Sequence, residues 1–142
     1  MNLITHNLFP TLVAEVKDFL TEQQCDDIVD FSKTYSPHKY GVIQGDADTT
    51  YSSKSTALID VQKNIKSCSD ILNNVEVAIK AYSDITGIKS GKLDNSWISY
   101  QRPGSQLLTH THPSSLISAV VYLKVDENSS KIYFPACTCA TG

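Results

Sequence analysis

The sequence lacks several features that define large classes of protein. It has no run of about 18 apolar residues, so no transmembrane helix is predicted. Lysine and arginine are scattered and the net charge is −3, which leaves no basic surface for nucleic acid or for an anionic membrane. Low-complexity tracts and internal repeats are also absent, which argues against disorder. The 142 residues, 41% of them hydrophobic, are typical of one packed domain.

Two further absences concern the cellular compartment. The first ten residues show no charged region followed by an apolar one, so no secretion signal is predicted. The four cysteines are too few and too dispersed for a small domain held together by disulfides. They are Cys25, Cys68, Cys137 and Cys139. We therefore expect reduced thiols in a soluble, cytoplasmic protein.

Helix signals occupy the first part of the chain. Residues 7–20 open with a short strand-like run. Thr21 and Gln24 then form a capping box, which predicts a helix that ends at Ser36-Pro37. Residues 38–51 contain glycine and aspartate breakers and predict an exposed loop, and residues 56–61 predict a short strand. A second, longer helix is predicted to end at Gly87, because six apolar residues form one helical stripe. They are Ile65, Cys68, Leu72, Val75, Ile79 and Tyr82.

After Gly91 the pattern changes to short strands separated by turns. The predicted strands are 96–100, 105–110, 116–125 and 131–134. The predicted turns lie at 102–104, 113–115 and 126–129. The expected fold class is therefore α+β, with antiparallel strands and helices that share one core, in a single domain over residues 1–142.

Two histidines stand one residue apart in the stretch G-S-Q-L-L-T-H-T-H-P, Gly104 to Pro113. Residues i and i+2 of a strand share a face, so His110 and His112 could both face solvent or a polar groove without binding anything. The same spacing also offers a transition metal two adjacent imidazoles and leaves other coordination positions open. The spacing alone does not complete a metal site.

Three stretches resemble the phage and marine-bacterial branch of the Fe(II)/2-oxoglutarate-dependent dioxygenases. They are W-I-S-Y-Q-R-P-G (97–104), H-T-H-P (110–113) and L-I-S-A-V-V-Y-L (116–123). In that branch a tryptophan strand leads to a glycine, to a histidine six residues later and to a strand similar to L-S-G-V-Y-Y-L. The resemblance extends over roughly residues 8–135.

The resemblance implies a fold and a cofactor. It implies a double-stranded β-helix (jelly roll), with residues 1–90 as helical support and residues 91–142 as the first part of the β-helix. It also implies Fe(II) as the metal and 2-oxoglutarate as a small-molecule co-substrate. His110 matches the first ligand of the family's H-x-D/E pair, and His112 stands where a carboxylate is usual. Tyr100 corresponds to a tyrosine that related prolyl hydroxylases place near the co-substrate, although a strand tyrosine is also a common core residue.

Two further parts of such a site are missing from the sequence. The family takes a second histidine from a later strand and a basic residue for the distal carboxylate of 2-oxoglutarate, yet no histidine or arginine follows His112. Only about three strands fit between residue 105 and the end, whereas a closed roll needs about eight. We therefore expect a C-terminally incomplete chain with weak metal binding and little turnover. Cys137 and Cys139 are only a weak option as replacement ligands, because sulfur suits Zn better than Fe(II) and a chance C-x-C pair is favoured. Arg102 is expected to be a solvated turn residue, and Trp97 is expected to be a packing residue without a role in the chemistry.

Two other functions fit parts of this pattern. A cupin-type metal-binding protein has a G-x5-H-x-H motif, which Gly104 to His112 match, but Leu116 and Ile117 occupy the place of its glutamate. A non-catalytic phage structural or binding module would explain the missing ligands. The substrate is not identified by the sequence, and the expected location is the cytoplasm of a bacterial or phage-infected cell.

Overall fold

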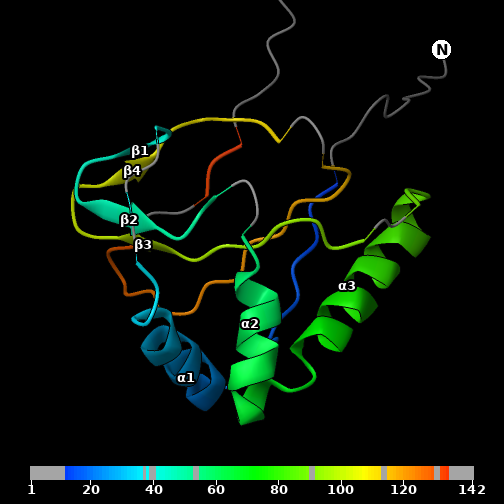
Figure 1. Ribbon diagram of the computed structural model, residues 1–142. Coiled ribbons are helices and arrows are strands. Elements are labelled where there is room, and N and C mark those ends of the chain that lie inside the picture. The colour runs from blue at the N-terminus through cyan, green and yellow to red at the C-terminus, as the bar shows by residue number, and fades with distance from the viewer. Residues whose placement is uncertain are drawn as a thin grey trace, which may run out of the picture.

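The computed structural model describes residues 12–36, 38, 41–52, 55–89, 92–112, 115–129 and 132–134. Helices and short antiparallel strands alternate along the chain, which confirms the α+β class. The strands lie together on one side of the molecule, with α1 and α2 beneath them and α3 beside α2 (Figure 1). The helices are α1 (Glu22–Ser32), α2 (Ala57–Asn64), the 3₁₀ helix η1 (Lys66–Cys68) and α3 (Ile71–Thr86). The strands are β1 (Ile43–Gln44), β2 (Ala47–Thr49), β3 (Ser99–Gln101) and β4 (Gln106–Leu107).

Helix α1 begins as predicted and ends early. Gln24 Oε1 accepts a hydrogen bond from the Thr21 N–H (2.9 Å), and Thr21 Oγ1 accepts one from the Gln24 N–H (3.2 Å), so the capping box is confirmed. The predicted end at Ser36-Pro37 is wrong, because α1 ends at Ser32. The Ser32 and Thr34 hydroxyls donate to carbonyls three residues earlier, and such bonds compete with helix continuation.

The strands pair across the two halves of the chain. β2 pairs with β3, with Asp48 opposite Tyr100, and β1 pairs with β4, with Ile43 opposite Leu107. The prediction that residues 38–51 form only an exposed loop is therefore wrong, since this region supplies β1 and β2 and buries Ala47 and Thr49. The predicted antiparallel pairing is confirmed.

The region of α2 and α3 differs from its prediction in two ways. Residues 57–64 form a helix, so the strand predicted over 56–61 is wrong. The predicted stripe is also divided, because the extended backbone at Ile65 ends α2 and α3 begins only at Ile71. Contacts with α1 hold this break, since the Gln24 amide donates to the Ser67 carbonyl (2.6 Å). The end of α3 at Gly87 is confirmed, with φ +72°.

One core joins the helices to the later segments, as predicted. Ile28 from α1, Val61 from α2, and Ile65, Cys68 and Ile71 form its buried centre. Ile98 and Leu123 pack against this centre from the second half of the chain. Cys25 and Cys68 are free thiols, as predicted, whereas Cys137 and Cys139 lie outside the described residues. Burial raises the pKa of both described thiols.

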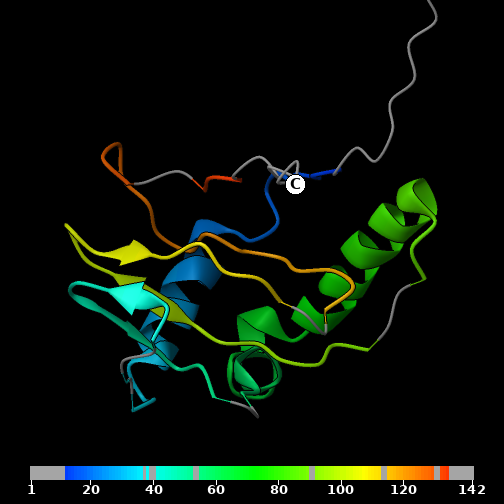
Figure 2. The same ribbon diagram turned by 90° about the horizontal axis from the view of Figure 1, so that it is seen from above.

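Several predicted strands are wrong. Within the described residues, no strand is present over 115–129 or 132–134, although the turns at 102–104 and 126–129 form as predicted. The strand-like run that opens residues 7–20 begins outside the described residues. A strand exists only where a neighbouring backbone pairs with it, so β-propensity alone misled the prediction for 116–125. This segment crosses the helical side of the molecule (Figure 2), where Lys124 forms an ion pair with Asp26 of α1 (2.6 Å).

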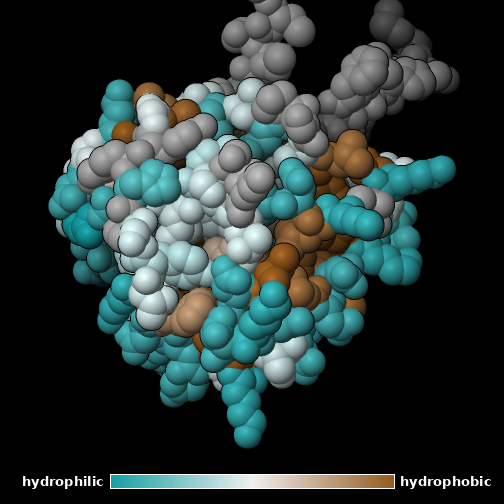
Figure 3. Space-filling model, viewed as in Figure 1, coloured by the Kyte–Doolittle hydropathy of each residue, from teal (hydrophilic) through white to brown (hydrophobic). Residues whose placement is uncertain are grey.

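The described surface is unevenly apolar. In the view of Figure 3, hydrophobic residues gather over the region between α2 and α3, and much of the remaining face is polar. Several strongly exposed apolar residues belong to the segment after the histidines, among them Leu116, Val120, Val125 and Phe134. None of the described helices is long and apolar enough to cross a membrane.

Candidate functional site

The two histidines follow the end of β4. The Leu108 N–H donates to the Val42 carbonyl (2.8 Å), which extends the contact of β4 with the β1 region by one residue. The described residues 109–112 do not pair with another strand, and both His110 and His112 are exposed. The sheet therefore fixes the base of this segment and leaves the imidazoles at the surface.

The imidazole rings of His110 and His112 lie side by side. Their centroids are 4.9 Å apart, and the ring planes are inclined at 68°. Nδ1 of His110 lies 2.7 Å from the Leu108 carbonyl, so this nitrogen carries the proton in the neutral ring and donates to that oxygen. Metal-binding histidines commonly make such a bond with the nitrogen that does not bind the metal. Nε2 of His110 is therefore the nitrogen suited to coordinate a cation.

Two aromatic residues continue the group of rings. The Trp97 indole stacks on His112, with centroids 5.9 Å apart and planes inclined at 26°. The Tyr51 ring meets Trp97 edge to face at 5.0 Å. Rings from the end of β2, the approach to β3 and the segment after β4 thus meet in one place. We call Tyr51, Trp97, His110 and His112 the ring cluster.

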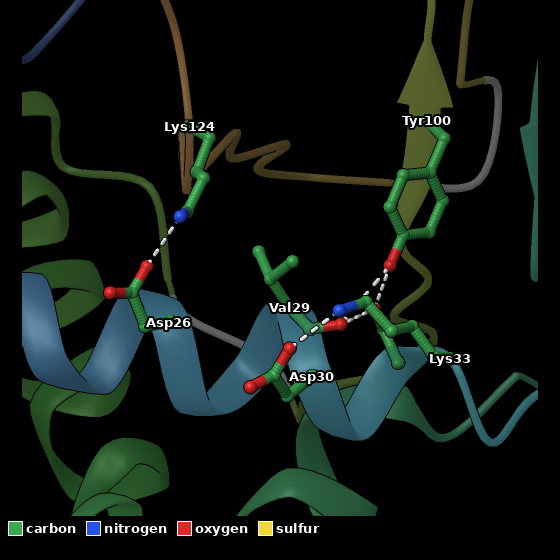
Figure 4. A network of polar contacts seen from close by, with 7 residues as sticks. Asp26, Val29, Asp30, Lys33, Tyr100 and Lys124 are labelled. Carbon is green, nitrogen blue, oxygen red and sulfur yellow. Dashed lines mark hydrogen bonds and ion pairs between the residues drawn. The ribbon is translucent and has the colours of Figure 1, made fainter.

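Tyr100 lies on β3 and points toward α1 (Figure 4). Its hydroxyl contacts the Ser32 hydroxyl and lies 3.3 Å from the Val29 carbonyl, to which it can donate. The side chain is half-buried, and burial raises the pKa of its hydroxyl. These contacts join the sheet to the helix, while a place for Tyr100 beside the co-substrate stays a prediction.

Arg102 pairs with two carboxylates. Its guanidinium lies 3.1 Å from Asp46 Oδ1 and 2.9 Å from Asp48 Oδ2, and its side chain is 48% exposed. The hydrogen bond that the guanidinium donates to Asp48 and the charge of Asp46 raise the pKa of the guanidinium. Arg102 is thus a turn residue, as predicted, but it is also engaged with its neighbours. It connects the turn before β4 to the β1–β2 connection.

The donor set of the described residues fits part of an iron site. Two imidazoles are suitable ligands for two positions of Fe(II). Within the described ranges, however, no group of three or more histidine, cysteine, aspartate or glutamate side chains is arranged to hold a metal ion. The described donors therefore do not complete the three-ligand set of this chemistry.

Strands β3 and β4 and three members of the ring cluster, Trp97, His110 and His112, lie in a segment that matches a known family. Residues 95–138 match the family described as "Putative 2OG-Fe(II) oxygenase". The matched segment of this 2OG-Fe(II) oxygenase family contains Trp97, Tyr100, Arg102, His110 and His112. No curated protein and no solved structure was found to match the chain.

The match confirms the predicted oxygenase resemblance over this segment, which is shorter than the predicted range of about 8–135. A 2OG-Fe(II) oxygenase family implies Fe(II) and 2-oxoglutarate in general, and the cupin alternative is not favoured. Sequence reasoning did not find the contact between Trp97 and His112. The two residues are far apart in sequence, and only the pairing of the surrounding segments could have indicated it.

Proposed function

We propose that this chain is a 2-oxoglutarate- and Fe(II)-dependent dioxygenase that carries out a hydroxylase-type oxidation of an unidentified substrate. The observation that carries the proposal is the position of the adjacent imidazoles of His110 and His112 inside the segment that matches the oxygenase family. The hydrogen bond from Nδ1 of His110 to the Leu108 carbonyl supports it further, because this bond holds the proton on Nδ1 and leaves Nε2 available to a metal.

Each predicted site residue has a role in this proposal. His110 binds the metal through Nε2, and His112 binds it at the position where the family usually has a carboxylate. Tyr100 contacts the co-substrate. In this family, Fe(II) and 2-oxoglutarate together supply the oxidising chemistry. A neutral imidazole stands in place of an anionic ligand, and the described residues supply two metal ligands where this chemistry uses three. We therefore expect weak metal binding and little turnover.

The finer description of the fold belongs to the same proposal. We place the pairs β1–β4 and β2–β3 at the beginning of a double-stranded β-helix in one domain, supported by the helices before residue 90. The mixture of helices with small antiparallel sheets is compatible with this arrangement. The phage branch and the cytoplasmic location also stay predictions from the resemblance.

Metal titration of the purified chain tests the proposed site. Trp97 is the only tryptophan and stacks on His112, so a paramagnetic ion bound at the pair should quench its fluorescence. We expect anaerobic Co²⁺ or Fe²⁺ to quench the emission, and His110→Ala or His112→Ala to weaken binding about tenfold or more. His38→Ala is the control, since this histidine lies outside the ring cluster. Added 2-oxoglutarate should change the Co²⁺ absorption spectrum.

The activity assay follows succinate formation from 2-oxoglutarate with Fe²⁺ and O₂. We expect a low rate that the double variant His110→Ala/His112→Ala abolishes. If this double variant bound Co²⁺ as tightly as the unmodified chain, the metal would be held elsewhere and the proposed site would be wrong.

A further inference from the structure

The backbone on both sides of Trp97 is held by hydrogen bonds. The Ser96 carbonyl accepts from the Ala57 N–H (3.1 Å), and the Ser96 hydroxyl accepts from the Leu58 N–H (2.9 Å), so the start of α2 fixes this residue. On the other side, Ile98 exchanges hydrogen bonds with Thr50: its N–H donates to the Thr50 hydroxyl and its carbonyl accepts from the Thr50 N–H, both at 2.9 Å. The backbone that carries the indole is therefore well fixed.

Packing also constrains the direction of the indole. Ile98 packs against the core, whereas Trp97 keeps 36% of its surface exposed. Neighbouring residues of extended backbone point to opposite faces, so burial of Ile98 directs Trp97 outward. The edge of Tyr51 meets the indole at 5.0 Å and limits its movement. Trp97 thus presents a supported aromatic face.

His112 has less support from its own backbone than Trp97 has. It lies beyond β4, where the described chain makes no ladder hydrogen bonds, and its carbonyl accepts one turn hydrogen bond, from the Ser115 N–H (3.0 Å). His110 is oriented by the Leu108 carbonyl, whereas within the described residues the His112 ring contacts the rings of Trp97 and His110. The two imidazoles are therefore held by different means, one by a carbonyl and the other by an aromatic face.

We propose that Trp97 is a positioning residue that holds the His112 imidazole beside His110, so that the pair is arranged for a cation before the cation arrives. This inference rests on the proposed function, because it assumes that the pair binds a metal. It assigns to Trp97 a role at the site in place of the packing role that its sequence context indicates. When Trp97 supports the His112 ring, this side chain has fewer orientations in the metal-free protein. Less conformational entropy is then lost when a cation binds, which favours binding of the cation.

The test compares metal affinities of variants by calorimetric titration with Co²⁺ under anaerobic conditions, so that the measurement does not depend on tryptophan fluorescence. Trp97→Leu removes the aromatic face, and we expect it to weaken Co²⁺ binding about tenfold, at the lower end of the range for outer-shell residues. Trp97→Phe retains a ring and should bind within about twofold of the unmodified chain. Tyr122→Leu is the matched control, because Tyr122 is an exposed aromatic residue (53%) outside the ring cluster.

Four outcomes decide between these possibilities. Weaker binding by Trp97→Leu with rescue by Trp97→Phe supports the inference, provided that circular dichroism shows both variants folded. If Trp97→Leu folds and binds Co²⁺ as the unmodified chain does, the positioning role is wrong and the proposed metal site is unaffected. If the unmodified chain does not bind Co²⁺, the proposed function and this inference both fail. If Trp97→Leu does not fold, Trp97→Phe decides. A folded Trp97→Phe variant that loses as much Co²⁺ affinity as His112→Ala would contradict the inference, because an aromatic face would then be insufficient to position His112.

Discussion

Tyr100 is the residue for which the sequence and the structure suggest different roles. The resemblance predicts a contact with 2-oxoglutarate, whereas the described hydroxyl contacts Ser32 and the Val29 carbonyl of α1. Ser32 is only 2% exposed, so this contact lies at the boundary between sheet and helix. A contact of this kind stabilises the fold whether or not the tyrosine also meets a ligand.

Tyr100→Phe separates the two roles. Loss of the hydroxyl removes its hydrogen bonds at a half-buried position and should lower the free energy of unfolding by about 1 kcal/mol. Urea denaturation measures this change, and Tyr122→Phe, whose side chain is exposed, should change stability very little. An unchanged stability would contradict the structural role. If Tyr100 also contacts the co-substrate, the variant should require more 2-oxoglutarate to perturb the Co²⁺ spectrum.

At the scale of elements, two turns are in close contact. Gly45, between β1 and β2, has φ +81°, and a Cβ on it would lie 2.9 Å from Ser105 Cα and 3.0 Å from the Gly104 carbonyl oxygen. The salt bridges of Arg102 with Asp46 and Asp48 join the same two regions. This contact lies at the approach to β4, the strand that leads to the histidines.

Gly45→Ala should therefore disturb the pairing of β1 with β4. The left-handed backbone alone costs an alanine about 1–2 kcal/mol, and the backbone clash adds to it because neither atom belongs to a flexible side chain. Gly104→Ala is the matched control, since it has a similar φ (+82°) and no atom within 4 Å of the added Cβ. Thermal or urea unfolding should show a larger loss for Gly45→Ala than for Gly104→Ala, and equal losses would contradict the importance of the contact.

The elements that the sequence predicted correctly depend on neighbouring residues. The Thr21–Gln24 capping box and the left-handed Gly87 are local devices, and both occur where expected. The elements that it missed depend on distant partners. Strand β2 exists because it pairs with β3, and Thr56 joins Ser96 in a bridge just before α2 begins. Gly45 and Asp46 look like loop residues in the sequence, since nothing nearby in it shows what they pack against.

At the scale of the whole molecule, the candidate site was predictable only in part. The spacing of His110 and His112 was visible in the sequence, and the segment that matches the family contains both residues. The support for His112 was not visible, because Trp97 meets it only after the chain has folded. A shared core was predicted correctly from the absence of repeats and linkers. The division of the apolar stripe between Ile65, η1 and α3 was not predicted, because it involves a contact with α1.

The contact between α1 and α2 should make global stability depend on pH. The Tyr35 hydroxyl, just after α1, donates to Asp60 Oδ2 of α2 (2.9 Å). Burial, followed by this bond and the charge of Asp60, raises the pKa of Tyr35 from 10.0 to about 12. Because the folded state holds the proton more tightly than the unfolded state, the stabilisation is complete below pH 10 and is lost as the pH rises through about 12.

Tyr35→Phe isolates this contribution from the lysines and thiols that titrate in the same range. At pH 7 to 9 the variant should be less stable than the unmodified chain by about 1 kcal/mol, the usual contribution of one hydrogen bond. Between pH 10 and 12 this difference should shrink, because an ionised Tyr35 loses its donor and faces the Asp60 carboxylate. Urea denaturation at a series of pH values measures it, with Tyr133→Phe as the control because Tyr133 is 79% exposed. If the difference in stability between the two proteins stayed constant up to pH 12, folding would not raise the pKa of Tyr35, and the proposed pH dependence would be wrong.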